Sequence, residues 1–79
     1  MIKQRTQCIV KLNPADVKDF VLAASKCDFD VDIAYGSVVV DAKSILGILG
    51  MDLRKNLTVS YYGENENFES FLNTIRVAA

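Results

Sequence analysis

The spacing of hydrophobic residues changes abruptly at Asn13-Pro14, and this change constrains the fold more than any other feature of the chain. Before it, every second residue from Thr6 to Leu12 is small or apolar, as on one face of a β-strand. After it, apolar residues from Val17 to Ala24 recur at the three- and four-residue spacing of a helix. The chain therefore begins with a strand, predicted over residues 3–12, that leads directly into an amphipathic helix.

The boundary itself has the composition of a helix start. Asn13 suits the N-cap, Pro14 the first helical position and Asp16 the third. We expect the helix to end near Lys26 or Cys27.

The rest of the chain alternates in the same way between strand and helix patterns. It predicts a strand at 29–35, a turn at Gly36, a strand at 37–42, a short helix at 44–49, a strand at 57–62 and a closing helix at 65–77. The order β-α-β-β-α-β-α indicates a single α+β domain over residues 1–79. We expect an open-faced β-sandwich, with a four-stranded antiparallel sheet and three helices on one face. The side chains expected on its buried face are Val10, Phe29, Val31, Ile33, Val38, Val40, Leu57 and Val59, and those on its open face are Asp30, Asp32, Ser37, Asp41, Thr58 and Ser60.

Charge and hydropathy exclude several classes of partner. The formal net charge is −1 and no basic run is present, so we expect no direct contact with nucleic acid. No apolar stretch approaches the roughly 20 residues that span a bilayer, so we expect no membrane insertion. The polar start of the chain does not match a signal peptide, which predicts a cytosolic protein.

The residue types available for chemistry are few. The chain has no histidine, and its two cysteines, Cys8 and Cys27, do not form a Cys-x-x-Cys pair. We interpret them as small buried side chains, and the aspartates at 28, 30 and 32 as a solvated strand face. No triad, metal-ligand set or phosphate-binding glycine loop is present, so we expect no enzyme activity, no metal ion and no cofactor.

Two segments resemble a known family. The run Ala42-Lys43-Ser44-Ile45-Leu46-Gly47, together with Asp19-Phe20-Val21 in the first helix, is similar to HPr, the histidine-containing phosphocarrier of the bacterial sugar phosphotransferase system. The order of strands and helices is also that of HPr, so the resemblance extends over nearly the whole chain. It implies the HPr fold and, in the family, transfer of a phosphoryl group on one histidine.

The histidine motif of that family is missing from this chain. Members have Leu-His-x-Arg-Pro at the start of the first helix, and the motif falls on residues 12–16. Asn13 takes the position of the histidine and Ala15 that of the arginine. An amide nitrogen delocalised into its carbonyl is not a useful nucleophile, and alanine cannot hold a phosphoryl group. We therefore expect no catalytic residue here and interpret the segment as a helix cap.

Ser44 corresponds to a second site of the family. The resemblance implies regulatory phosphorylation of this serine from ATP by a dedicated kinase, after which the phosphoprotein assists a transcriptional repressor in carbon catabolite repression. Catabolite-repression HPr-like proteins likewise lack the histidine and keep the serine. Ser44 can equally be an unmodified N-cap, and both interpretations stay open. Beside it, we expect Ile45, Ile48 and Leu49 to form an apolar surface for a protein partner.

These observations predict an HPr-like protein that acts by regulation or interaction. Its partners would be a serine kinase of the HPr type, a transcriptional regulator or components of the phosphotransferase system. Two alternatives remain: an adaptor that uses the fold without phosphorylation, and an atypical phosphocarrier. The sequence predicts neither the identity of the partner nor the oligomeric state.

Overall fold

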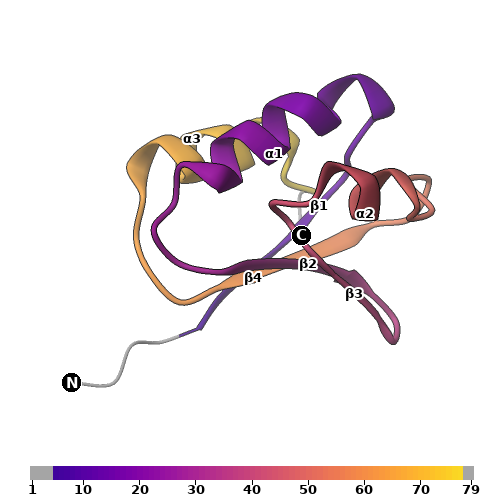
Figure 1. Cartoon of the computed structure of the whole chain (residues 1–79), viewed down its shortest axis with the longest axis horizontal. Helices are drawn as coiled ribbons and strands as arrows, with labels where there is room; N and C mark the ends of the chain where they lie inside the picture. Colours follow the sequence, from indigo (N-terminus) through magenta and orange to yellow (C-terminus); the bar gives the residue numbers. More distant parts are fainter. Residues whose placement is uncertain (1–4, 78–79) are drawn as a thin grey trace.

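A computed structural model of the chain describes residues 5–77, which form one sheet covered on one side by helices (Figure 1). The strands are β1 (Thr6–Val10), β2 (Val31–Tyr35), β3 (Val38–Asp41) and β4 (Leu57–Tyr61). They lie in the order β1-β4-β2-β3, and every neighbouring pair is antiparallel. The helices are α1 (Val17–Ser25), α2 (Ile45–Leu49) and α3 (Glu66–Ile75). The predicted α+β open-faced sandwich is confirmed.

The first helix begins differently from the prediction. Residues Pro14–Asp16 form a short 3-10 turn, η1, that leads into α1. Asn13 does lie at the N-cap position, but its side chain makes no capping hydrogen bond. Its backbone carbonyl instead accepts a hydrogen bond from the Asp16 amide at 2.8 Å. The proline fixes the backbone at the first position and donates no hydrogen bond, which favours this tight turn. The preceding strand ends at Val10, and residues 3–4 of the predicted strand lie outside the described residues.

The core lies between the sheet and the two long helices. The Phe20 ring of α1 lies 6.1 Å from the Phe68 ring of α3, and the Tyr61 ring of β4 meets Phe68 edge-on at 5.4 Å. These centroid distances are in the favourable range for aromatic pairs. The fully buried large side chains are Phe20, Phe68, Leu12, Ile33, Ile48, Leu57, Leu72, Val10, Val17, Val31 and Val59.

Two residues depart from the predicted faces of the sheet. Val38 was expected in the core but is 41% exposed, because the β2–β3 hairpin projects past the helices (Figure 1). Ser60 was expected in water but is buried. It lies in β4, between β1 and β2, and its hydroxyl oxygen accepts a hydrogen bond from the Gln7 side chain at 3.2 Å. Phe29 and Val40 pack against the core but are only partly buried.

At two positions the backbone conformation favours glycine, and any other residue would be strained. Gly36 has a φ of 54° in the two-residue turn between β2 and β3, where a positive φ at the first position favours glycine. Gly63 follows β4 with a φ of 154°, and a side chain there would collide with the Phe29 ring.

Within residues 5–77, no helix is both long and apolar enough to cross a membrane.

Candidate interaction site at helix α2 and the start of helix α1

Residues 13–16, which lead into α1, offer no histidine and no cation. The side chains of Asn13, Pro14 and Ala15 are exposed, and Asp16 is partly exposed. None of these four side chains has a ring nitrogen that could form a phosphohistidine, and none is a cation that would hold a phosphoryl group. The η1 turn carries the Asp16 carboxylate and the first turn of α1 carries that of Asp19, and both disfavour an anion there.

Ser44 lies at the N-cap of α2, as predicted, and its capping role is visible in the structure. Its hydroxyl oxygen accepts a hydrogen bond from the Gly47 amide at 3.2 Å, and its carbonyl accepts one from Ile48 at 3.1 Å. Its own amide donates to the Asp41 carbonyl at 3.0 Å. Ser44 therefore orders α2 and is itself only partly buried.

The loop before Ser44 is hydrogen-bonded both to β3 and to the end of α1. The Asp41 carboxylate accepts a hydrogen bond from the Lys43 amide at 2.8 Å. The Lys43 ammonium group donates to the Cys27 carbonyl, just beyond α1, at 3.0 Å. These contacts fix the position of α2 relative to β3 and α1.

Gly47 lets α2 approach the sheet closely. A Cβ atom at this position would lie 2.5 Å from a methyl group of Val40 in β3 and 3.2 Å from the Ser44 hydroxyl oxygen. Any larger residue would push the helix away from the strand and disturb the cap.

The predicted apolar surface is wrong at one residue. Ile48 is fully buried and belongs to the core, so it cannot contact a partner. Leu46, which was not predicted, is 80% exposed. Leu46 and Ile48 are two positions apart, which is about 200° around a helix, so they face opposite ways. Ile45 and Leu49 lie at the rim, at 41% and 53% exposure.

The sequence contained only part of the signal for this arrangement. Apolar residues spaced i, i+3, i+4 define the side of a helix that usually faces a core, which places Leu46 on the other side. The spacing does not show that Ile45 and Leu49 stay at the rim while Ile48 alone is fully buried. We define the α2 surface as Ile45, Leu46 and Leu49.

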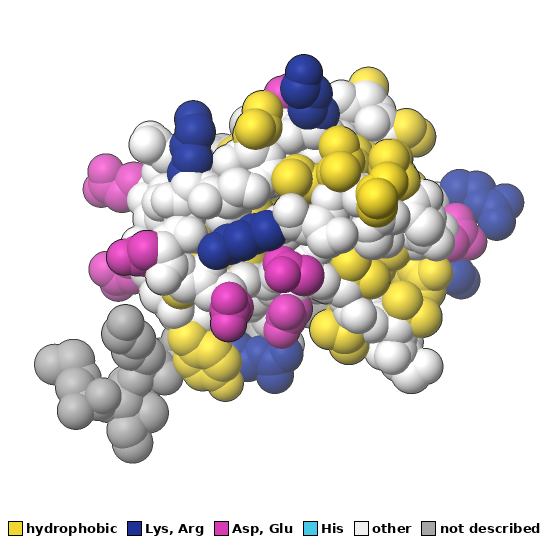
Figure 2. Space-filling model, in the orientation of Figure 1, with side chains coloured by type: hydrophobic (Ala, Val, Ile, Leu, Met, Phe, Trp, Pro, Cys, Tyr) yellow, Lys and Arg dark blue, Asp and Glu magenta, His cyan; other side chains and the backbone are white. Residues whose placement is uncertain are grey.

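The α2 surface lies at the same end of the molecule as the start of α1, and α1 packs against α2 (Figure 1). Hydrophobic side chains gather at this end in Figure 2, with a second group over the β2–β3 hairpin. The Lys11 ammonium group donates a hydrogen bond to the Arg54 carbonyl, which joins the end of β1 to the loop after α2. The segment between β1 and α1 and the helix that carries the α2 surface are therefore held in fixed positions relative to each other.

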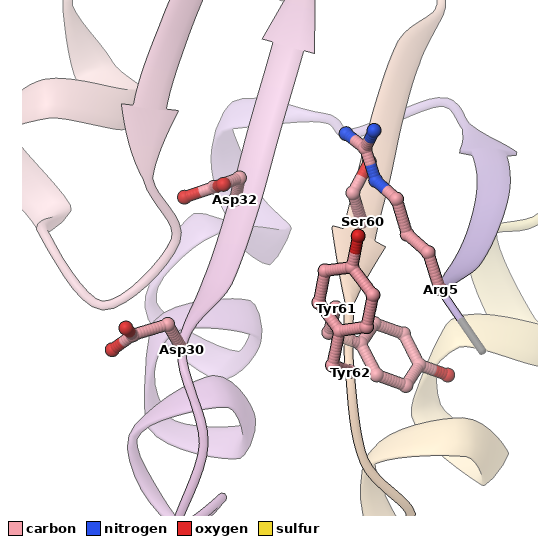
Figure 3. A pocket seen from close by; sticks show the side chains of 6 residues that line it. All are labelled: Arg5, Asp30, Asp32, Ser60, Tyr61 and Tyr62. Carbon is pink, nitrogen blue, oxygen red and sulfur yellow. The ribbon is translucent and has the colours of Figure 1, made fainter. Parts of the chain in front are cut away.

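A pocket of about 240 Å³ lies elsewhere, at the start of β2 and the end of β4 (Figure 3). Its walls carry charges of both signs, from Arg5, Asp30 and Asp32, beside the Tyr62 ring. In the part of the chain that the structure describes, the one ion pair joins Arg54 to Asp52, so Arg5 does not pair with either aspartate. The pocket shares no residue with the α2 surface.

The cysteines and aspartates form no further site. Cys8 and Cys27 are both free and buried, and this burial raises the pKa of each thiol. Such thiols react slowly, because the thiolate is the nucleophile. The side chains of Asp28, Asp30 and Asp32 are exposed, and no group of three metal-binding side chains occurs within residues 5–77.

The sheet order, the three helices on one face and the serine-capped α2 beside the start of α1 define a small domain of the phosphocarrier type. The family model for the "PTS HPr component phosphorylation site" matches residues 11–77. The chain belongs to the HPr family of the phosphotransferase system. Members of this family are phosphocarrier proteins, not enzymes, and their partners are protein components of that system.

Solved structures agree with this fold. The HPr phosphocarrier of Bacillus anthracis str. Ames has a TM-score of 0.69 and 22% identity, with coverage of 95% of this chain and 99% of that chain. HPr-C-His from Thermoanaerobacter tengcongensis has a TM-score of 0.68 and 21% identity, with coverage of 90% and 92%. At these identities the likeness concerns the fold alone.

Proposed function

We propose that this protein is an HPr-family member that acts by binding protein partners through the α2 surface, and does not carry phosphohistidine. The observation that carries the proposal is the complete absence of histidine from the 79 residues. The family's phosphoryl transfer requires a ring nitrogen whose phosphorylated form is labile, and the amide of Asn13 does not supply one. Asn13, at the position of the family histidine, is exposed and makes no capping hydrogen bond.

The α2 surface has the features of a docking site. Leu46 projects from it at 80% exposure, with Ile45 and Leu49 at its rim. Large apolar side chains clustered on a small domain favour contact with another protein. The partner classes that this family suggests are a serine kinase of the HPr type, a transcriptional regulator and phosphotransferase components.

Phosphorylation of Ser44 is the proposed switch for this surface. Ser44 is partly exposed and directly precedes Ile45 and Leu46. A phosphate at an N-cap accepts hydrogen bonds from the first helical amides and adds negative charge beside the apolar side chains. It would change what the surface binds without unfolding α2.

Intact-mass analysis after two separate reactions tests the proposal. One reaction supplies ATP and an HPr-type serine kinase, and the other supplies phosphoenolpyruvate and the first enzyme of the phosphotransferase system. We expect one phosphate from ATP, none from phosphoenolpyruvate, and none in a Ser44→Asn variant. Asparagine is a matched control because it caps a helix as well as serine does, whereas Ser44→Ala would also cost about 0.5–2 kcal/mol of stability.

The other results favour the alternatives. Phosphate taken from phosphoenolpyruvate would show an atypical phosphocarrier and contradict the proposal. No phosphate from either donor, with partner binding that is lost in Leu46→Asp but kept in Ser44→Asn, would favour an adaptor without phosphorylation.

A further inference from the structure

One edge of the sheet is covered by another segment of the chain, and the other edge is open. The chain after α3 returns along β1, where the Val77 amide donates to the Ile9 carbonyl at 2.9 Å and the Lys11 amide donates to the Ile75 carbonyl at 2.9 Å. A bridge between Val10 and Arg76 completes this cover. β3 forms the other edge, and no described segment pairs with its outer side.

The backbone of β3 presents hydrogen-bonding groups to this open side. A two-residue turn joins Tyr35 to Val38, and the pair that closes such a turn is hydrogen-bonded. Because the pairs alternate, Ala34 and Val39 form a non-hydrogen-bonded pair. The N–H and C=O of Val39 therefore point away from β2, and the Asp41 amide points the same way.

The centre of this edge is apolar. Val38 and Val39 are 41% and 62% exposed. Of the devices that usually prevent pairing with another chain, the edge has a short length of four residues and one charge, Asp41 at its end, but no lysine or proline. A second group of hydrophobic side chains is visible over the hairpin in Figure 2.

We propose that β3 is a self-association edge, at which a second copy of the chain pairs through its own β3 in antiparallel orientation about a two-fold axis at Val39. In this register Val39 lies opposite Val39 of the second copy, and the two residues can exchange both main-chain hydrogen bonds. The same register brings Ser37 opposite Asp41 of the second copy, where a hydroxyl can donate to a carboxylate. A shift that centres the axis on Asp41 would oppose two carboxylates and is disfavoured.

This register explains why the occupant is a second copy. The segment from Ser37 to Asp41 is complementary to itself in its backbone and in its side-chain hydrogen-bonding groups, with an apolar centre and one acceptor opposite one donor at each end. One short pair of strands contributes few hydrogen bonds and little buried area, so the association is expected to be weak. It uses none of the α2 surface residues and stands independently of the proposed function.

Sedimentation equilibrium at concentrations up to about 1 mM, the range in which small interfaces associate, tests the proposal. We expect a reversible dimer. In both Val39→Lys and Val39→Pro, its dissociation constant should rise about tenfold or more. The proline removes only an outward-facing N–H, and an NMR spectrum of each variant checks that the domain is folded. As a second measurement, amide exchange at Val39 should slow as the concentration rises.

Two matched controls locate the contact. Ile9→Lys places a charge on the same open face, at a residue 50% exposed, but on the strand whose edge is covered. Leu46→Lys places a charge on the α2 surface. Both should dimerise like the unmodified protein. A protein that stays monomeric at all concentrations, as expected if β3 instead receives an extended segment of a different protein, overturns the proposal. So does dimerisation that is lost in Leu46→Lys or Ile9→Lys and kept in the Val39 variants.

Discussion

Asn13 and Ser44 show how single residues decide what this member of the HPr family can do. Asn13 keeps the strand-to-helix junction intact through its backbone carbonyl while its side chain is free of capping contacts. Ser44 caps α2 through its hydroxyl and is only partly buried. The fold can therefore persist without the histidine, because neither the turn nor the helix depends on an imidazole.

Tyr61 gives the molecule a pH dependence that can be measured. Burial first, and the nearby Glu69 second, raise the pKa of its hydroxyl from 10.0 to about 12. The folded state then holds this proton more tightly than the unfolded state, so stability is complete below pH 10 and falls as the pH rises toward 12. We expect a loss on the order of 2 kcal/mol across this interval.

Urea unfolding at several pH values between 9 and about 12 measures this effect. Tyr61→Phe is the control, because it keeps the ring between Phe29 and Phe68 and removes the ionisable group. It should lose less stability over the same interval. An equal loss in both proteins would mean that other groups cause the alkaline destabilisation.

Among the elements, α2 separates what the sequence could predict from what it could not. Its bounds followed from Ser44 as a cap and Gly50 as a stop, and both lie where expected. Its rotation did not follow, because Ile45, Ile48 and Leu49 can serve either as a core stripe or as an exposed patch. The close contact of Gly47 with Val40, across the sheet interface, turns Ile48 inward.

Helix α1 and strand β3 show the same limit. The helical spacing from Val17 to Ala24 placed α1, and the apolar run after the turn at Gly36 placed β3. These patterns did not show that η1 precedes α1, or that Val38 lies past the cover of the helices. Both depend on how neighbouring elements end, and single-chain periodicity contains no such information.

The inward rotation of α2 predicts opposite results for two leucine-sized side chains. Ile48→Ala removes a fully buried group and should lower the free energy of unfolding by about 2–5 kcal/mol. Leu46→Ala removes one that is 80% exposed and should change it by less than about 0.5 kcal/mol. Urea unfolding of both variants tests the assignment. Similar losses in the two would contradict the orientation of α2 and the definition of its surface.

At the scale of the whole molecule, the residues after α3 cover one edge of the sheet and leave the other edge open. Ile75 and Val77 exchange backbone hydrogen bonds with the residues around Val10, so the last described segment acts as a fifth, very short strand. This arrangement joins the C-terminal part of the chain to β1, its first strand. It also leaves β3 as the edge at which another chain can add.

Val77→Pro tests this closure, because proline lacks the N–H that bonds to the Ile9 carbonyl at 2.9 Å. Arg76, at φ −66° and ψ 136°, already has the extended conformation that a following proline requires. We expect a loss of about 1 kcal/mol in the free energy of unfolding and faster amide exchange at Lys11, whose partner carbonyl belongs to the same segment. Val77→Ala keeps the N–H and shortens the side chain, so it should exchange at Lys11 like the unmodified protein. If the proline variant matches the alanine variant in both measurements, the segment after α3 does not hold the β1 edge.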